Sequence, residues 1–306
     1  MEKRYNSFVE FFKNKYGHRL QKIVIDAGFT CPNRDGSISR GGCTFCDNAA
    51  FHPGYSVASK SIATQIEEGI EFHRGRYRNT LEYLAYFQPY SNTYAPLGKL
   101  KSLYEEALSH KAVAGIVIGT RPDCIDGEKL DYLAQLSKDH IVIVEYGIES
   151  CNNATLAHIN RGHTWEQAEQ AVRMTAERGI MQGAHFIIGL PGETREDFIS
   201  MAEKINTLPI DSVKFHQLQI IKGTAMENEF SEHPERFVTF SLDEYIDLFV
   251  DILERLRPTL YIERFAGEVP PRFVNSTPWG LIRNVELLRL LDKRLEERNT
   301  YQGRLV

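Results

Sequence analysis

The sequence of 306 residues lacks an apolar run long enough to cross a membrane. It also lacks the apolar segment of a secretory signal, because its first residues, MEKRYNSFVEFFKNKYG, have the spacing of a short amphipathic helix. These absences exclude a helical membrane protein and an exported one. We therefore expect a cytoplasmic protein that does not bind membranes.

An excess of positive charge is missing as well. Lysine and arginine number 36 against 41 aspartates and glutamates, for a net charge of −5. Such a balance excludes a global electrostatic footprint for nucleic acid, although it allows a local basic patch. Arg74, Arg76 and Arg78 form one small basic cluster, but the solvated end of a helix explains them equally well.

Cysteine is scarce, and it is unevenly placed. The chain has five, an odd number without an export signal, so a disulfide framework explains them poorly. Cys31, Cys43 and Cys46 lie on one glycine-rich loop with the spacing C-x11-C-x2-C. Three thiolates can hold a [4Fe–4S] cluster and leave one iron open to a further ligand. The same cysteines with His52 could form a Cys3His zinc site, because the spacing alone does not decide between the metals.

Apolar, β-rich segments alternate with amphipathic helical segments, which is typical of a parallel sheet with crossover helices. Six such units predict an α/β fold, a partial (β/α)6 TIM-like barrel with a C-terminal extension, or a closed barrel if more strands follow Tyr261. We expect residues 1–240 to form the barrel with its N-terminal helix, and residues 241–306 to pack on it. The expected strands are Lys22–Phe29, Leu81–Tyr90, Gly115–Thr120, Ile141–Ile148, Gly183–Leu190 and Val213–Ile221. The expected helices are Ser59–Phe72, Leu97–Ser109, Glu128–Lys138, Trp165–Arg178 (with a capping box of Thr164 and Gln167), Arg195–Asn206, Leu242–Leu256 and Val285–Glu297.

Polar motifs follow five of the expected strands. Cys31 comes after the first strand, and QPYSN, TRPDC, ESCNN and GLPGE come after the next four. Because loops at the carboxyl ends of barrel strands form active sites, these motifs predict a ring of loops around one site. Cys124 and Cys151 lie in two of the motifs. One of them could donate a hydrogen atom or capture an intermediate, but burial as a packing residue is the commoner role of a free cysteine.

Six motifs carry a resemblance to a known family: VIDAGFTCPNRDGSISRGGCTFC, YFQPYSNTYAP, GTRPDC, EYGIESCNNATLAHINRGHT, IIGLPGET and KFHQLQIIKGT. In combination they resemble the radical S-adenosylmethionine (SAM) superfamily, and within it the YhcC/YtqA-like family, which is related to the radical SAM core of the elongator catalytic subunit. The resemblance implies a [4Fe–4S] cluster on Cys31, Cys43 and Cys46, with SAM chelating the open iron. It also implies reductive cleavage of SAM to a 5′-deoxyadenosyl radical, with an electron donor such as flavodoxin or ferredoxin.

The resemblance also assigns SAM-binding positions. Arg161 matches an arginine that pairs with the SAM carboxylate, a role that suits a guanidinium fork. Glu149 faces the methionine end of SAM. Gly119 replaces a glutamate that holds the ribose in relatives, so that Thr120 or His185 could substitute. The backbone of Gln88, Pro89 and Tyr90 would receive the SAM amino group, and the stretch Ile188, Gly189 and Leu190 would support the adenine.

Each position has a plainer alternative. Arg161 could be a surface residue, Glu149 a helix cap and His185 a core histidine. Kinship with the elongator core suggests a tRNA wobble uridine as substrate, with a small molecule as the alternative. The segment Arg264–Arg283, with Arg272, Trp279 and Arg283, could contact RNA or pack as a lid. A zinc protein and a protein that binds SAM without cleaving it are the other classes.

Overall fold

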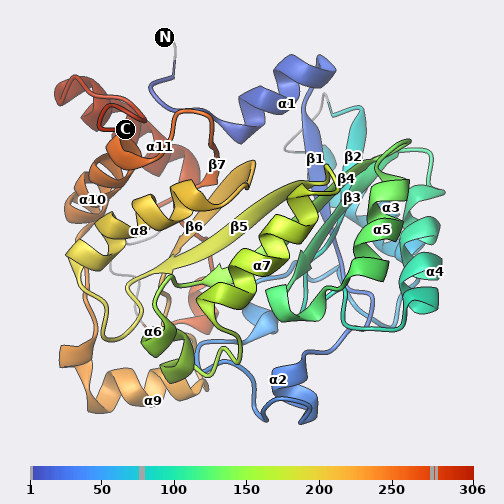
Figure 1. Ribbon diagram of the computed structural model, residues 1–306, viewed down its shortest axis with the longest axis horizontal. Helices are drawn as coiled ribbons and strands as arrows, with labels where there is room; N and C mark the ends of the chain where they lie inside the picture. The colour runs from blue at the N-terminus through green and yellow to red at the C-terminus, as the bar shows by residue number, and fades with distance from the viewer. Residues whose placement is uncertain (1–2, 76–79, 276–278, 280–281) are drawn as a thin grey trace.

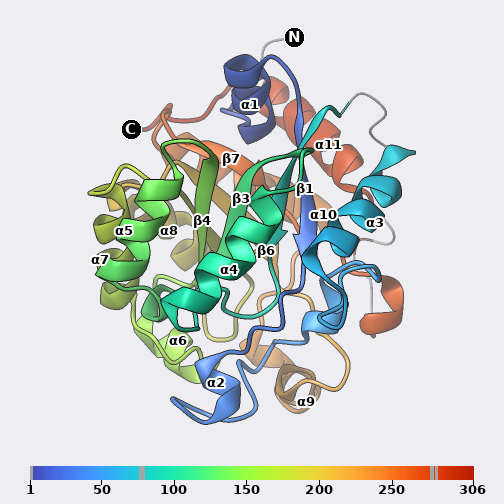
Figure 2. The same cartoon turned by 90° about the vertical axis from the view of Figure 1, so that its right-hand side faces the viewer.

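The structure is a computed structural model that describes residues 3–75, 80–275, 279 and 282–306 (Figure 1). Its centre is one sheet of seven strands in the order β1-β2-β3-β4-β5-β6-β7, and every neighbouring pair is parallel. The order is linear, so the curved sheet is a half-barrel with β1 and β7 as its edges (Figure 2). The strands are β1 (Leu20–Ile25), β2 (Glu82–Phe87), β3 (Val113–Thr120), β4 (Ile141–Glu149), β5 (Met181–Ile188), β6 (Ser212–Gln217) and β7 (Tyr261–Arg264).

The predicted partial TIM-like barrel is confirmed, with all six expected strands and one more, β7. Several expected strands end too late, because their last residues turn away into the loops of the site. The seven expected helices and the capping box of Thr164 and Gln167 are also present. The helices are α1 (Phe8–Tyr16), α2 (Pro32–Asp35), α3 (Ile62–Arg74), α4 (Leu97–Leu108), α5 (Gly127–Leu136), α6 (Asn153–His158), α7 (Trp165–Ala176), α8 (Arg195–Thr207), α9 (Ala225–Glu232), α10 (Leu242–Arg255) and α11 (Asn284–Glu297), with short 3-10 turns η1 (Asn48–Ala50), η2 (Pro122–Cys124), η3 (Pro234–Arg236) and η4 (Pro271–Phe273).

The main core lies between the sheet and its outer helices. On β4, Val144, Tyr146 and Ile148 belong to this core, while Ile143 belongs to a second cluster inside the barrel. Successive strand side chains point to opposite faces, so the same alternation decides which residues line the interior. No helix among the described residues is long and apolar enough to cross a bilayer.

Helix α1 closes the amino-terminal end of the half-barrel. Phe8 and Phe12 on α1 pack with Leu84, Val117 and Ile143 from the inner face of the sheet. The segment before α1 also runs beside β7, where Ile262 N donates a hydrogen bond to Asn6 O at 2.7 Å. In Figures 1 and 2, α2, α6 and α9 lie at the opposite end of the sheet, where the strands finish. The open end of the barrel is therefore the one that carries the polar motifs.

A buried ionic network crosses the interior between these two ends. Glu145 on β4 is 1% exposed and accepts hydrogen bonds from Lys214 on β6 at 2.6 Å and from Lys22 on β1. Lys22 also reaches Glu263 on β7 at 2.6 Å, so the two edge strands are joined without a shared ladder. Burial alone would raise the pKa of Glu145, but attraction to the two lysines holds that pKa well below its usual value.

Candidate functional site

Glycines shape the cysteine loop at the carboxyl end of the sheet. Cys31 is the N-cap residue of α2, and Cys46 N donates a hydrogen bond to Cys43 O at 3.0 Å. Gly41 and Gly42 have φ angles of 85° and 87°, in the left-handed region that favours glycine. A Cβ atom on Gly42 would lie 3.0 Å from Arg34 Nε. The loop can therefore wrap closely around a bound group.

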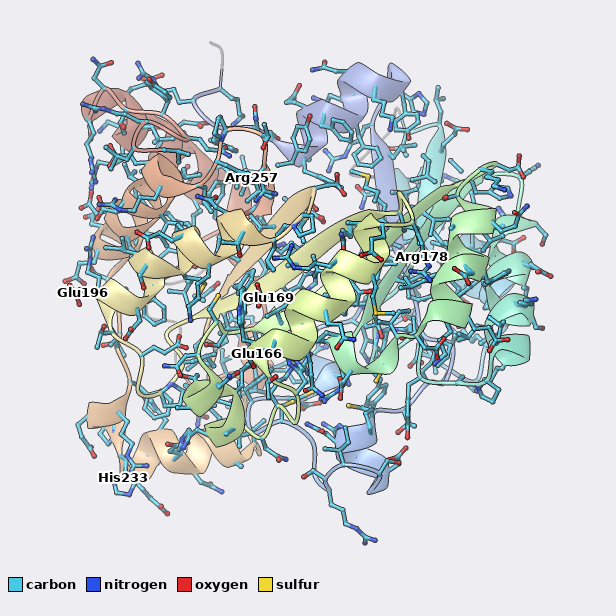
Figure 3. All side chains as sticks on the ribbon, viewed as in Figure 1. Glu166, Glu169, Arg178, Glu196, His233 and Arg257 are labelled. Carbon is cyan, nitrogen blue, oxygen red and sulfur yellow. The ribbon has the colours of Figure 1, made fainter. Side chains whose placement is uncertain are left out.

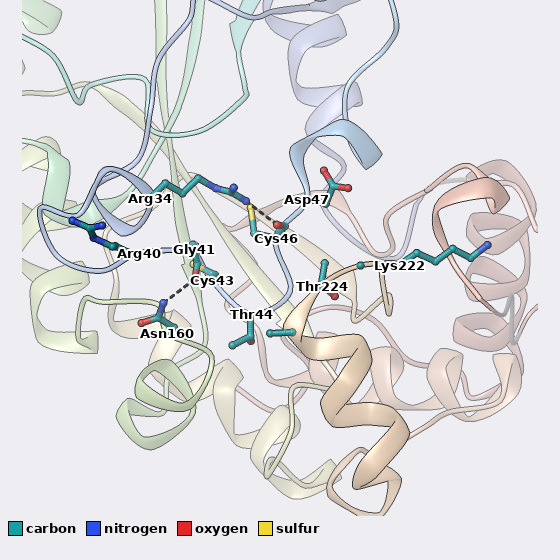
Figure 4. Close-up of a pocket in the computed structure, with 13 residues that line it drawn as sticks. Arg34, Arg40, Gly41, Cys43, Thr44, Cys46, Asp47, Asn160, Lys222 and Thr224 are labelled. Atoms are coloured by element: carbon teal, nitrogen blue, oxygen red, sulfur yellow. Dashed lines mark hydrogen bonds between the residues drawn. The ribbon is translucent and has the colours of Figure 1, made fainter.

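A pocket of about 420 Å³ opens between this loop and the start of α9 (Figure 4). Its lining includes the cysteines Cys43 and Cys46, and Arg34 crosses one side to donate a hydrogen bond to Cys46 O at 2.9 Å. The other lining residues are Arg40, Gly41, Gly42, Thr44, Asp47, Asn160, Lys222, Gly223, Thr224 and Ala225.

The cysteines do not form a site for one metal ion. Within the described part of the chain, no group of three or more histidine, cysteine, aspartate or glutamate side chains is arranged to hold an ion. His52, the fourth ligand in the zinc hypothesis, instead has its Nδ1 atom 3.3 Å from Pro53 O. The arrangement does not support a mononuclear Cys3His site.

The surroundings of Cys43 fit a cluster-bound thiolate. Two N–H donors point at its sulfur, Arg161 Nη1 at 3.5 Å and Asn33 Nδ2 at 3.6 Å, and hydrogen bonds of this kind tune iron–sulfur ligands. Burial and the neighbouring Cys43 both raise the pKa of the Cys46 thiol. Negative charges on both sulfurs would therefore repel one another, and a positively charged iron centre would relieve that repulsion.

Arg161 connects the cysteine loop to the end of β4. It is only 7% exposed, so it is not a surface arginine. Its Nε atom donates to His163 Nε2 at 3.1 Å, and Nη2 contacts Gly147 O and lies 3.4 Å from Glu149 Oε1. Burial lowers its pKa, but the nearby Cys43 and Glu149 reverse that effect and raise it, so the group stays charged. A buried, oriented guanidinium of this kind can bind a carboxylate.

The backbone is strained where Glu149 meets Arg161. Glu149 has a φ of 76°, which is rare for a residue with a side chain. Gly147, two residues earlier, leaves the space that both side chains use. A Cβ atom there would lie 2.6 Å from Glu149 Oε1 and 2.7 Å from Arg161 Nη2. Glu149 is the last residue of β4 rather than a helix cap.

Two residues of this site were not identified from the sequence. Asn33 is fully buried, and its Nδ2 atom donates to Asn160 O and, at 2.9 Å, to Arg161 O, which ties the cysteine loop to the arginine. His163 lies against Arg161, and burial together with that positive charge lowers its pKa to about 3. Both residues lie within motifs of the sequence, Asn33 in CPNR and His163 in NRGH, and this position is the signal that could have identified them.

The QPYSN loop lies beside the cysteine loop, as its place after an expected strand predicts. Ser91 N donates a hydrogen bond to Thr30 O at 3.2 Å. Tyr90 has a φ of 66°, and the Arg34 guanidinium lies 5.7 Å from its ring centroid. The loop is therefore close to the cysteine loop. That the backbone of Gln88, Pro89 and Tyr90 receives the SAM amino group stays a prediction.

Thr120 and His185, the two candidates for the ribose contact, have side chains on opposite faces of the sheet. The Thr120 hydroxyl bonds to the hydroxyls of Thr93 at 2.6 Å and Ser91 at 3.1 Å in a buried network, so it is not available as expected. The reason is strand alternation, which turns Thr120 away from the interior. His185 does point inside, where its Nε2 atom lies 3.0 Å from Glu145 Oε2 and its ring 5.6 Å from that of His216.

The prediction that the Ile188 side chain supports the adenine of SAM is wrong. Its side chain belongs to the core between sheet and helices, so only its backbone can face a ligand inside the barrel. Ile187, the preceding residue, alternates to the other face. Leu190 is fully buried in a separate cluster with Leu156 and Phe45, next to the cysteine loop.

The two remaining cysteines lie in different places. Cys124 is 5% exposed near the cysteine loop, and burial raises its pKa to about 11. Cys151 belongs to the outer core and lines a pocket of about 350 Å³ with Trp165 and Lys204. The expectation that Cys151 approaches the substrate cavity is therefore wrong, because its side chain lies on the helix side of the sheet. Figure 3 shows this helix side, with Glu166 and Glu169 of α7 labelled.

Comparison with known proteins agrees with this geometry. YtqA of Bacillus subtilis is 33% identical over 99% of this chain and 93% of its own length. YhcC of Escherichia coli is 36% identical over 87% of this chain and 84% of its own length. The tRNA uridine(34) acetyltransferase of Dehalococcoides mccartyi is 24% identical over 59% of this chain and 38% of its own length.

A solved structure shares the fold. Elp3 of the archaeon Methanocaldococcus infernus superposes with a TM-score of 0.69 at 16% identity, over 92% of this chain and 64% of that protein. Residues 31–205 match the Radical SAM superfamily, and residues 210–297 match the Radical_SAM C-terminal domain. With a cysteine loop suited to a [4Fe–4S] cluster and a buried arginine beside it, the chain belongs to the radical SAM superfamily, whose cofactors are that cluster and SAM.

Proposed function

We propose that this chain abstracts a hydrogen atom from a uridine in tRNA. Cys31, Cys43 and Cys46 would hold the [4Fe–4S] cluster, which would supply the electron for reductive cleavage of SAM and so the radical chemistry needed to remove a hydrogen atom from the substrate. The chain itself contributes ligands, orientation and exclusion of water. The observation that carries the radical part of this proposal is the position of Arg161, buried between Cys43 Sγ at 3.5 Å and Glu149 Oε1 at 3.4 Å.

The residues around Arg161 have separate tasks. Cys31, Cys43 and Cys46 would ligate the cluster, and the Arg161 guanidinium would hold the SAM carboxylate beside it. His185, on the inner face of β5, would reach the ribose through its other ring nitrogen, because its Nε2 atom lies 3.0 Å from Glu145 Oε2. The interior of the barrel next to His185 holds an ion pair, because Glu145 and Lys214 are 2.6 Å apart and almost fully buried. Bulk water is thus excluded from beneath the reacting groups by charged pairs that are already satisfied.

The similarity to tRNA uridine(34) acetyltransferases supports tRNA as the substrate class. We also propose the cytoplasm as the compartment and residues 1–240 as the catalytic unit, with residues 241–306 packed on it and adding β7 to its sheet. Two observations favour a second candidate, a small-molecule substrate. The net charge is −5, and Trp279, named above among the residues that could contact RNA or pack as a lid, packs on Tyr245 with ring centroids 4.5 Å apart. Of the basic cluster near residue 74, Arg74 pairs with Glu71 at 2.7 Å, and Arg76 and Arg78 lie outside the described residues.

The radical chemistry is tested without knowing the substrate. The anaerobically reconstituted chain, reduced with dithionite and given SAM, should form 5′-deoxyadenosine, and an Arg161→Gln variant should keep its iron but form far less. Bound zinc without iron would overturn the proposal. SAM that binds and stays intact would also overturn it, in favour of a binding protein.

The substrate class is tested separately in cells. Nucleoside mass spectrometry of bulk tRNA should show one modified uridine that disappears when the gene is deleted and returns with the wild-type gene. A gene with Cys46→Ala is the matched control and should not restore it. An unchanged nucleoside profile would exclude tRNA and leave the small-molecule candidate.

A further inference from the structure

Asn33 gives the Cys43 sulfur a second N–H donor, which the contacts proposed for SAM do not include. Asn33 is the second residue of α2 and is fully buried. Its Nδ2 atom lies 3.6 Å from Cys43 Sγ, and Arg161 Nη1 lies 3.5 Å from the same sulfur. The Arg161 guanidinium is also the group proposed to bind the SAM carboxylate, whereas the Asn33 amide bonds only to the protein. The two donors can therefore have different functions.

Two carbonyl oxygens fix the direction of the Asn33 amide. Its Nδ2 atom donates hydrogen bonds to Asn160 O and, at 2.9 Å, to Arg161 O. If the amide were turned over, its oxygen would face these two acceptors, so the nitrogen must be the atom beside Cys43. The Asn160 side chain bonds in turn to the cysteine loop, where its Nδ2 atom donates to Gly42 O at 2.7 Å (Figure 4). The donor on Cys43 is thus held from both segments.

The other end of the amide makes no hydrogen bond. Asn33 Oδ1 is buried and has no partner among the described residues. Gly162 lies against it, since a Cβ atom there would be 2.6 Å from Oδ1. A buried oxygen without a partner costs free energy of folding. The surroundings of Asn33 therefore use the donor side of its amide and not the acceptor side.

We infer that Asn33 is a positioning residue that acts through Cys43 to raise the reduction potential of the cluster. The inference rests on the proposed function, which makes Cys43 a cluster ligand. Reduction adds one electron and no proton, so the charge shared by the sulfur ligands becomes more negative. An N–H donor stabilises that reduced form more than the oxidised one, because a hydrogen bond strengthens with the charge on its acceptor. Without the Asn33 donor, the same cluster should be harder to reduce.

The test measures the midpoint potential of the reconstituted chain without SAM, by electron paramagnetic resonance of samples poised with dithionite and redox mediators. Asn33→Leu should lower the midpoint by about 59 mV, a tenfold shift in the one-electron equilibrium. Asn33→Asp keeps the size of the side chain but also lacks the N–H group, so it should shift the midpoint in the same direction. It serves as the test if the leucine variant loses its cluster. The matched control is Asn206→Leu, because Asn206 bonds to Arg255 O and Arg257 N just before β6, at the other end of the sheet. This control should keep the wild-type midpoint.

A double variant separates the Asn33 donor from its effect on Arg161. Asn33 also bonds to Arg161 O, so a displaced guanidinium could lower the potential by itself. If the amide acts on the sulfur directly, Asn33→Leu should still lower the midpoint in an Arg161→Gln background. No further shift in that background would overturn the inference, as would a wild-type midpoint in the Asn33 variants. Failure of the wild type to form 5′-deoxyadenosine, with these shifts intact, would instead count against the proposed function alone, because the midpoint is measured without SAM.

Discussion

Nη1 of Arg161 lies 3.5 Å from Sγ of Cys43, so one buried guanidinium joins the loop after β4 to the cysteine loop after β1. The same guanidinium contacts Gly147 O and Glu149 at the end of β4. A group predicted to hold the SAM carboxylate is thus fixed from two sides before any ligand arrives. Preorganisation of this kind lowers the cost of orienting a ligand, because the receiving group is already ordered.

Gly147→Ala tests this fixation without removing any functional group. The added methyl would lie 2.7 Å from Arg161 Nη2 and must displace it. We expect the variant to keep its cluster and to bind SAM at least about tenfold more weakly, the loss of about one charge-assisted hydrogen bond. Isothermal titration with SAM and iron analysis measure the two properties. Gly98→Ala on α4, where a Cβ atom meets nothing within 4 Å, is the control and should leave both unchanged.

The sequence was sufficient for the order of the β/α units, because apolar periodicity and helix caps are local signals. It was not sufficient for the face on which a residue lies. Thr120 and Ile188 were assigned to the ligand, yet a shift of one position along a strand turns a side chain to the other side. The ionic network was also invisible, since Lys22 and Glu263 are far apart in sequence and meet only across the curved sheet.

Cys46→Ala should abolish the cluster, while Cys124→Ala and Cys151→Ala should retain it. Cys46 lines the pocket on the cysteine loop, whereas Cys151 lies in the outer core. Iron content and the visible absorbance of the protein check this after anaerobic reconstitution. If Cys151→Ala lost its iron while staying folded by circular dichroism, the assignment of the three ligands would be wrong.

Glu145→Gln should destabilise the fold strongly, because it leaves Lys22 and Lys214 in the interior with one carboxylate fewer. We expect a loss of about 3 kcal/mol in the free energy of unfolding, as for broken buried ion pairs. Urea unfolding of the cluster-free chain measures it. Glu286→Gln, which breaks an exposed pair with Arg289 on α11, should cause no measurable loss.

The effect of Glu145→Gln should also depend on pH. The folded-state pKa of Glu145 is held well below its usual 4.5, so its ionised form stabilises the native state above that value. This contribution is lost as the pH falls through the lowered pKa. The difference in stability between wild type and variant should therefore shrink in acid. A difference that stays constant down to the acid-unfolded state would show that the charge of Glu145 is not the cause.

His163 predicts a second and separate pH dependence, at higher pH. Its pKa is lowered from 6.5 to about 3 by burial and by Arg161, with Arg121 acting in the same direction and Asp123 against it. As the pH falls below 6.5, this residue binds a proton in the unfolded chain, whereas in the native state it stays neutral. Each pH unit should then reduce the free energy of unfolding by about 1.4 kcal/mol for each such histidine.

His216 behaves in the same way, because burial and the nearby Arg264 lower its pKa well below 6.5. Urea unfolding at several values between about pH 6.5 and 5 measures the slope to which the two histidines contribute. His163→Gln should remove about half of the slope, since Gln can still accept the hydrogen bond from Arg161 Nε but carries no titrating group. The double variant with His216→Gln should have almost none. If both variants kept the full slope, the protons would be taken up elsewhere in the unfolded chain.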